Sequence, residues 1–312
     1  MSERAVVCED LRAAIGDLER DGFRLDLIYP ADEPHTAVLG RDGESVRVTT
    51  QPDAAPPSEA LPAFAPEFAL TRAGGSTADG RAGMLYRDLI PGRLGGRYIA
   101  SHISIPDGGI VADWVHFHRI ALQMLHVRAG WVRVVYEDQG DPFVMREGDL
   151  VLQPPGIRHR VLESSPGLEV IEITAPALHA TFADHALGLL PNGRDPERLF
   201  GRQRFLHHRS ADIPWTPFGG GEAQETALAA ATGGLAEART VRRGASSEIQ
   251  FSPHGGELVF GFVLAGSATL DFREAPQLIA ADALVIPPRE PWQVINPTPD
   301  FRLLHVTTAR LG

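Results

Sequence analysis

Short strand-like segments follow one another closely between Tyr86 and Pro176, and this pattern limits the folds open to the chain. The region contains the segments GRYIASHISIP, RIALQMLHV, WVRVVYED, DLVLQPP and LEVIEITAP, with Gly, Pro and Asp in the turns between them. Many short strands separated by such turn residues favour a β-barrel or jelly roll. We therefore expect a mainly β fold.

Three histidines and one glutamine are spaced so that they could meet inside such a barrel. His116 and His118 alternate along one strand and project to the same face. Gln123 has the opposite parity, so we expect a bend or bulge between 119 and 122 to bring it inward. His159 follows the turn sequence PPG and begins another strand. Imidazole and amide groups can bind metals, so the pattern predicts one divalent metal per chain.

These residues resemble the two sequence motifs of the cupin superfamily. The first motif, G-x5-H-x-H-x3,4-E-x6-G, is matched by His116, His118, Gln123 and Gly130. Its opening glycine is displaced by one position, to Gly109. The second motif, G-x5-P-x-G-x2-H-x3-N, is matched by Gly148, Pro154, Gly156 and His159, with Glu163 in place of Asn. Two motifs in the expected order are more specific than an isolated His-x-His pair.

Gln123 is the one departure from the usual ligand set, because cupins more often have Glu there. Three imidazoles and an amide are all neutral, so they leave the full charge of a bound dication at the site. Such a metal would favour an anionic substrate and act as a stronger Lewis acid. Some cupins that isomerise uronates have a similar site.

A second copy of the barrel is expected toward the C-terminus, so that the chain resembles a bicupin. Aligning Gly266 with Gly130 places Ser252, His254 and Val259 at the ligand positions, Glu257 two positions out of register, and Trp292 where His159 stands in the first copy. An indole donates a hydrogen bond and cannot ligate a metal. We expect this degenerate barrel to be structural or to hold a metal-free pocket.

The expected organisation is two cupin (jelly-roll) β-barrels with a small N-terminal α+β appendage. The boundaries are 1–52 for the appendage, 53–84 for a linker rich in Pro, Ala and Gly, 85–180 for the metal-binding barrel, 181–209 for a connector and 210–312 for the degenerate barrel. Apolar residues at helical spacing predict a helix at the start of the appendage and another early in the connector.

Composition excludes several classes of partner. The formal net charge of −11 argues against nucleic acid and anionic membranes, because both need clustered basic residues. Cys8 is the single cysteine, so no internal disulfide is possible and a reducing compartment fits. The sequence has no apolar signal region and no stretch of membrane-spanning length. We expect a cytoplasmic protein.

Candidates for a catalytic base are few. Tyr98 and His102 share parity on one strand and would line the pocket if that face points inward. The alternative is that His102 is a hydrogen-bonded barrel residue. Alternation predicts that Arg158 and Arg160, on either side of His159, point away from the metal, and His126 has the wrong parity to join Gln123.

Three functions remain open at this stage, because a fold alone does not fix an activity. Resemblance to ring-cleaving bicupins favours an iron dioxygenase acting on an aromatic or enolisable anion. The second is a redox-neutral isomerase, lyase or ring-opening enzyme with zinc, nickel or manganese. The third is a non-enzymatic ligand binder or sensor. The resemblance also implies a homodimer.

Overall fold

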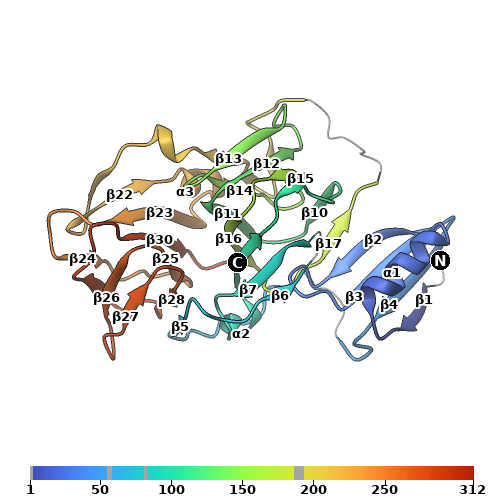
Figure 1. The fold of residues 1–312 in the computed structure, drawn as a ribbon, viewed down its shortest axis with the longest axis horizontal. Coiled ribbons are helices and arrows are strands. Elements are labelled where there is room, and N and C mark those ends of the chain that lie inside the picture. The colour runs from blue at the N-terminus through green and yellow to red at the C-terminus, as the bar shows by residue number, and fades with distance from the viewer. Residues whose placement is uncertain (1–2, 55–57, 81–82, 186–192) are drawn as a thin grey trace.

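The computed structural model describes residues 3–54, 58–80, 83–185 and 193–312, which form a small N-terminal appendage and two β-barrels in a row (Figure 1). Strands dominate all three parts, so the expected mainly β fold class is confirmed. In the described part of the chain, no helix is long and apolar enough to cross a membrane.

The appendage is one helix packed on a four-stranded sheet. Its elements are β1 (Glu3–Val7), α1 (Leu11–Arg20), β2 (Arg24–Tyr29), β3 (Thr36–Arg41) and β4 (Glu44–Thr49). Asp10 caps α1 by accepting a hydrogen bond from the Ala13 amide at 3.0 Å. The helix buries Leu11 against Phe23, Leu39 and other apolar residues of the sheet.

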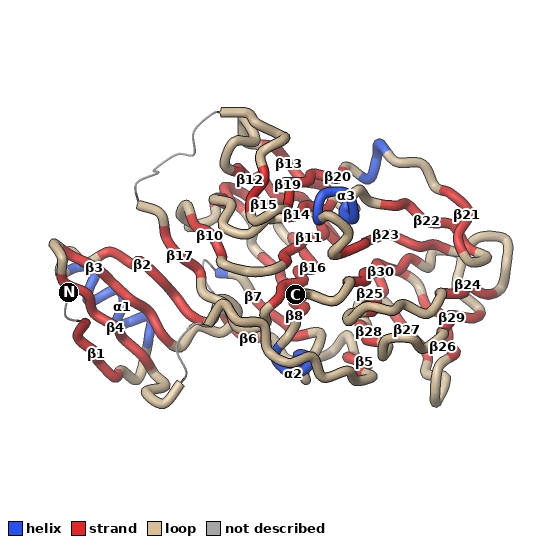
Figure 2. Tube along the Cα trace, turned by 180° about the vertical axis from the view of Figure 1, so that it is seen from behind, coloured by secondary structure: helices blue, strands red, loops and turns tan. Residues whose placement is uncertain are grey.

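The appendage is joined to the first barrel by backbone hydrogen bonds. Strand β2 pairs with β17 (Thr181–Ala183), which pairs in turn with β10 (His116–His118), and Figures 1 and 2 show β2 beside β17. The appendage sheet therefore continues directly into the strand that carries His116 and His118.

The first barrel is built from two sheets. Besides β10 and β17, it contains β6 (Ala78–Asp79), β7 (Leu85–Asp88), α2 (Arg93–Gly96), β8 (Ile99–Ile105), β9 (Gly109–Ile110), β11 (Leu122–Ala129), β12 (Trp131–Tyr136), β13 (Phe143–Arg146), β14 (Leu150–Leu152), β15 (His159–Ser164), β16 (Leu168–Ala175) and β20 (Leu206–His208). Alternation along β11 sends Gln123, Leu125 and Val127 inward. Leu122 and Met124 point outward, to a core shared with the second barrel.

The second barrel repeats this arrangement. Its elements are β5 (Ala69–Thr71), β21 (Thr216–Phe218), β22 (Gly221–Glu225), α3 (Leu228–Thr232), β23 (Ala236–Arg242), β24 (Glu248–Phe251), β25 (Val259–Ala265), β26 (Ser267–Asp271), β27 (Gln277–Ile279), β28 (Ala283–Val285), β29 (Trp292–Ile295) and β30 (Arg302–Thr308). A hairpin of β18 (Leu199–Phe200) and β19 (Gln203–Arg204) and a short 3-10 helix (Ser210–Asp212) precede it. Phe260 and Leu304 pack against Leu122 and Met124 across the barrel interface.

The two segments expected as linker and connector are parts of the barrels. Strand β5, within 53–84, pairs with β28 of the second barrel, and β6 pairs with β7 of the first. Strands β17 and β20, within 181–209, pair with β10 and β14. The helical spacing predicted early in the connector is wrong for 181–183, which are extended, and its end falls outside the described residues. Pairing with open sheet edges outweighs local propensity here.

Candidate metal centre

His116, His118 and His159 converge inside the first barrel. His116 and His159 face one another across the β10–β15 pair, with ring centroids 4.1 Å apart. One nitrogen from each of the three rings lies within 4.8 Å of the others, and all three side chains are buried. Among the described residues, this is the one cluster of at least three His, Cys, Asp or Glu side chains with such spacing.

Backbone carbonyls fix the orientation of all three rings. The Nδ1 atoms of His116, His118 and His159 lie 2.8, 3.1 and 3.0 Å from the carbonyl oxygens of Trp114, Ala180 and Ile157. A ring whose Nδ1 donates a proton carries its lone pair on Nε2, the form that binds a metal. The cluster therefore fits a divalent metal, with three neutral Nε2 donors preoriented by the backbone.

Asp113 and Trp114, which precede His116 in the chain, both contact its ring. The Asp113 Oδ1 atom lies 3.5 Å from the His116 Nδ1 atom, and its Oδ2 accepts a hydrogen bond of 2.8 Å from the Val161 amide. The Trp114 ring meets His116 edge to face and packs against the core of the appendage. A carboxylate beside a ligand histidine raises the basicity of that ligand.

A chain of hydrogen bonds turns the Gln123 oxygen away from Glu172. Glu172 Oε1 accepts a bond of 2.8 Å from Gln123 Nε2. The Gln123 Oε1 atom therefore lies on the other side, where it accepts a bond of 2.9 Å from Gln153 Nε2. The Tyr136 hydroxyl holds Gln153 by donating to its Oε1 at 2.6 Å. Gln153 Nε2 is also 3.4 Å from His159 Nε2, which brings this network to the cluster.

Gln153, Glu172 and Tyr136 were not identified from the sequence, although a signal for them existed. Gln153 and Glu172 interrupt apolar strand segments, and a polar side chain at such a place needs a partner inside the fold. The motif match covers His159 but gives no role to these residues. The expected bend between 119 and 122 is present, because β10 ends at His118 and β11 begins at Leu122 in the other sheet.

The structure places Tyr98 and His102 away from the cluster. They share parity, as predicted, but their face of β8 points toward the second barrel, while Ile103 and Ile105 point into the cavity. The buried Tyr98 hydroxyl donates to Glu257 at 2.9 Å, and His102 Nε2 lies 2.7 Å from Glu169. Burial raises the pKa of Tyr98 and lowers that of His102. The condition of an inward face is not met, so His102 is the hydrogen-bonded barrel residue of the alternative interpretation, and neither residue is positioned as a base at this site.

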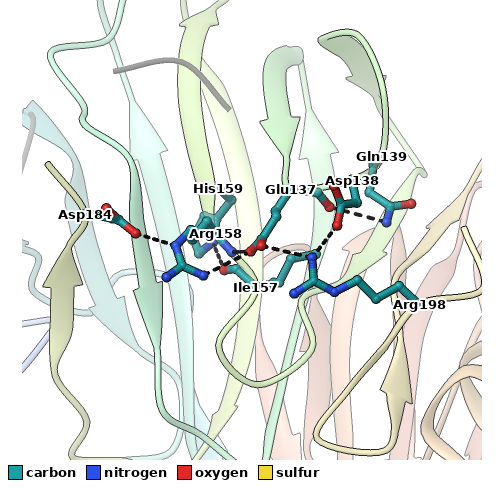
Figure 3. Close-up of polar contacts among 8 residues, drawn as sticks. All are labelled: Glu137, Asp138, Gln139, Ile157, Arg158, His159, Asp184 and Arg198. Atoms are coloured by element: carbon teal, nitrogen blue, oxygen red, sulfur yellow. Dashed lines mark hydrogen bonds and ion pairs between the residues drawn. The ribbon is translucent and has the colours of Figure 1, made fainter. Parts of the chain in front are cut away.

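Arg158 points away from the cluster, as strand alternation predicts. Its guanidinium is paired with Asp184 and lies 3.3 Å from Glu137, which also binds Arg198 at 3.0 Å (Figure 3). The hydrogen bond with Asp184 is the main cause that raises the pKa of Arg158. These pairs connect β15 to the segments after β17 and before β18.

Two cavities meet at the cluster. The larger, of about 80 Å³, has a polar end formed by His118, His159 and the glutamine network, and walls of aliphatic side chains. The smaller, of about 30 Å³, adjoins His118 and Gln123 and reaches Asp32 of the appendage and His179. His179 meets His118 edge to face at 5.2 Å, and burial lowers its pKa.

Aromatic rings occupy the corresponding place in the second barrel. Phe251 and Trp292 pair across β24 and β29 as His116 and His159 do in the first barrel, and their rings stack 3.8 Å apart. The buried His305 ring packs against both. His254 Nε2 bonds the Thr308 carbonyl at 2.8 Å, and Glu257 is paired with an arginine of the first barrel.

No protein-family model matches the sequence, and no curated protein matches it either. Solved structures do resemble the fold. The oxalate decarboxylase of Lactobacillus farciminis in complex with formate has a TM-score of 0.56 and 16% identity, with 82% of this chain and 89% of that chain covered. A deletion variant of the Bacillus subtilis oxalate decarboxylase has a TM-score of 0.57 and 13% identity, with 83% and 81% covered. These matches are longer than either barrel, so the chain shares a two-barrel fold with these proteins.

Proposed function

We propose that this chain is a metal-dependent enzyme that acts on a small organic anion. The observation that carries the proposal is the cluster of three oriented histidines, two of which, His118 and His159, line the polar end of a cavity in the first barrel. His116, His118 and His159 would hold the metal, and Gln123 is the candidate fourth ligand. A bound divalent metal would act as a Lewis acid toward an anion at this end of the cavity.

The favoured reaction class is redox-neutral cleavage or isomerisation beside a carboxylate or carbonyl group. Glu172 replaces Tyr98 and His102 as candidate base, because it lines both cavities and lies next to Gln123. The barrel strands exclude bulk water from the cluster, and the glutamine network orients polar groups toward it. The shared fold with oxalate decarboxylases is compatible with this class.

A dioxygenase acting on an aromatic or enolisable anion is the second candidate. The neutral donor set supports it, since three imidazoles leave several positions on iron open to substrate and oxygen. Iron fits this reaction, whereas zinc, nickel or manganese fits the redox-neutral one. The homodimer and the cytoplasmic location stay predictions.

Elemental analysis of protein purified without chelator, combined with turnover assays, tests the proposal. Near-stoichiometric metal with substrate-dependent product and no oxygen uptake would support the redox-neutral reaction. Iron with oxygen uptake on catechols, gentisate-like acids or diketones would support the dioxygenase. Metal retention with no turnover on either panel would favour the ligand binder, and absence of retained metal after reconstitution would contradict the metal centre.

A further inference from the structure

The larger cavity is strongly divided between a polar end and apolar walls. His118, His159 and Gln123 lie at one end, and the walls are formed by side chains such as Leu125, Val134, Val161 and Val170. Leu125 and Val161 keep part of their surface accessible although both line the cavity. Most apolar side chains of a barrel interior pack without leaving such a space.

The charges around this cavity suit a single negative charge. No arginine is among the described residues that line it, and the only carboxylate there is that of Glu172. Glu172 Oε1 accepts hydrogen bonds from Gln123 at 2.8 Å and from Thr174 at 2.9 Å. A second negative charge that lies along the walls, away from the metal, would therefore meet this carboxyl group or aliphatic side chains, without a basic partner.

The polar groups at the end of the cavity are already engaged with one another. Tyr136 donates to Gln153, and Gln153 donates to Gln123, so their hydrogen bonds are directed along the network. Beyond this end, the described lining residues are aliphatic side chains, two methionines and Tyr86, whose hydroxyl donates to the Met84 sulfur at 3.6 Å. Recognition away from the metal end must therefore rest on burial of apolar surface.

We propose that the cavity binds a monoanion with an apolar tail, its carboxylate or enolate head at the histidine cluster and its short alkyl tail along Leu125, Val134, Val161 and Val170. The head-group position rests on the proposed metal function, whereas the tail position rests on the walls alone. Succinate is a poor fit, because its second carboxylate would lie along these walls.

Isothermal titration calorimetry of the full-length, metal-loaded protein tests this inference with acetate, propionate, butyrate and succinate as probes. Burial of each methylene contributes about 0.8 kcal/mol, so the dissociation constant should fall about fourfold per methylene until the cavity is full. Butyrate should bind more tightly than succinate. Affinity that does not depend on tail length, or a preference for succinate, would overturn the inference.

A pair of variants on one strand gives a matched control. Val134 lines the cavity, whereas Val135 has the opposite parity on β12. Val134→Phe should abolish the gain from acetate to butyrate and leave metal content unchanged, and Val135→Phe should change neither the gain nor the metal content. Equal effects of the two substitutions would count against the tail position. If Val134→Phe does not fold, the dependence of affinity on tail length in the wild type still tests the inference.

Loss of the metal separates this inference from the proposed function. In His118→Ala, tail-length dependence that persists without metal would support the apolar binding site and contradict the metal as its anchor. In the wild type, normal metal content together with preferential binding of succinate over butyrate would contradict the tail position and would support the metal centre.

Discussion

The buried ion pair between Arg97 and Glu257 should contribute strongly to the stability of the two-barrel unit. The Arg97 guanidinium donates to the two Glu257 oxygens at 2.9 and 2.8 Å, and to the carbonyls of Pro62 and Leu311. The two side chains are only 8% and 6% exposed. Arg97→Met would leave the Glu257 carboxylate buried, with the Tyr98 hydroxyl as its remaining described donor.

Removing one partner of such a pair costs about 3–5 kcal/mol, because an uncompensated charge stays in a low-dielectric interior. We therefore expect Arg97→Met to lower the free energy of unfolding by about this amount at pH 7.5, measured by urea denaturation followed by circular dichroism. The double variant Arg97→Met, Glu257→Leu should recover most of the lost free energy of unfolding, since it also removes the carboxylate that would otherwise stay buried without its arginine partner.

The exposed pair Arg119–Glu59, 3.0 Å apart with side chains 55% and 66% exposed, supplies the control. Arg119→Met should cost less than about 1 kcal/mol. The reasoning is refuted if Arg97→Met costs no more than Arg119→Met, or if the double variant is as unstable as the single one. Metal content should be unchanged in all of these variants, because Glu257 is engaged at the barrel interface and not at the histidine cluster.

Three further predictions concern the metal centre and pH. His118→Ala should abolish metal retention in elemental analysis, whereas His254→Ala should leave it unchanged; a stoichiometry of two metals per chain in the wild type would refute the second statement. Gln123→Glu combined with Glu172→Gln, which keeps an amide donor in the pair 2.8 Å apart, should tighten metal binding, measured by competition with a chelator, because an anionic ligand replaces a neutral one, and weakened binding would argue against a ligand at this position. Burial lowers the pKa of His126 to about 4, below the value of about 6.5 in the unfolded chain, so the unfolded state binds the proton more tightly. The contribution of neutral His126 to the free energy of unfolding is fully present above pH 6.5. It should therefore fall by up to about 3 kcal/mol as the pH drops toward 4. His126→Leu should flatten this part of the profile without loss at pH 7.5, since neither ring nitrogen has a hydrogen-bond partner among the described residues, and an unchanged profile would contradict the assignment.

Local sequence patterns were sufficient to predict the strands of the first barrel and the convergence of its three histidines. Strand alternation and the PPG turn predicted that His116, His118 and His159 would share one interior, and the structure brings them together. Each of these inferences depends on two or three neighbouring residues, whose geometry is set by the backbone itself. The prediction that Arg158 points away succeeded for the same reason.

Inferences that required knowledge of which face of a strand is buried were less secure. Tyr98 and His102 share parity, but alternation cannot say whether that face meets the cavity or the neighbouring barrel. The sequence alignment of the two barrels set Ser252 against His116, whereas strand pairing sets Phe251 opposite Trp292, one residue away. Sheet register decided both cases.

The sequence by itself determined a mainly β chain and a set of candidate ligands, because strand period and turn chemistry are local properties. The second barrel was expected from the resemblance of the region around Gly266 to the first motif. The tertiary structure alone decided which strands close each sheet, including β5 and β20 from segments that read as loops. It also decided that Gln153 and Glu172 orient Gln123, and that the second barrel fills its interior with Phe251 and Trp292. These outcomes depend on contacts between residues distant in sequence, which no local pattern encodes.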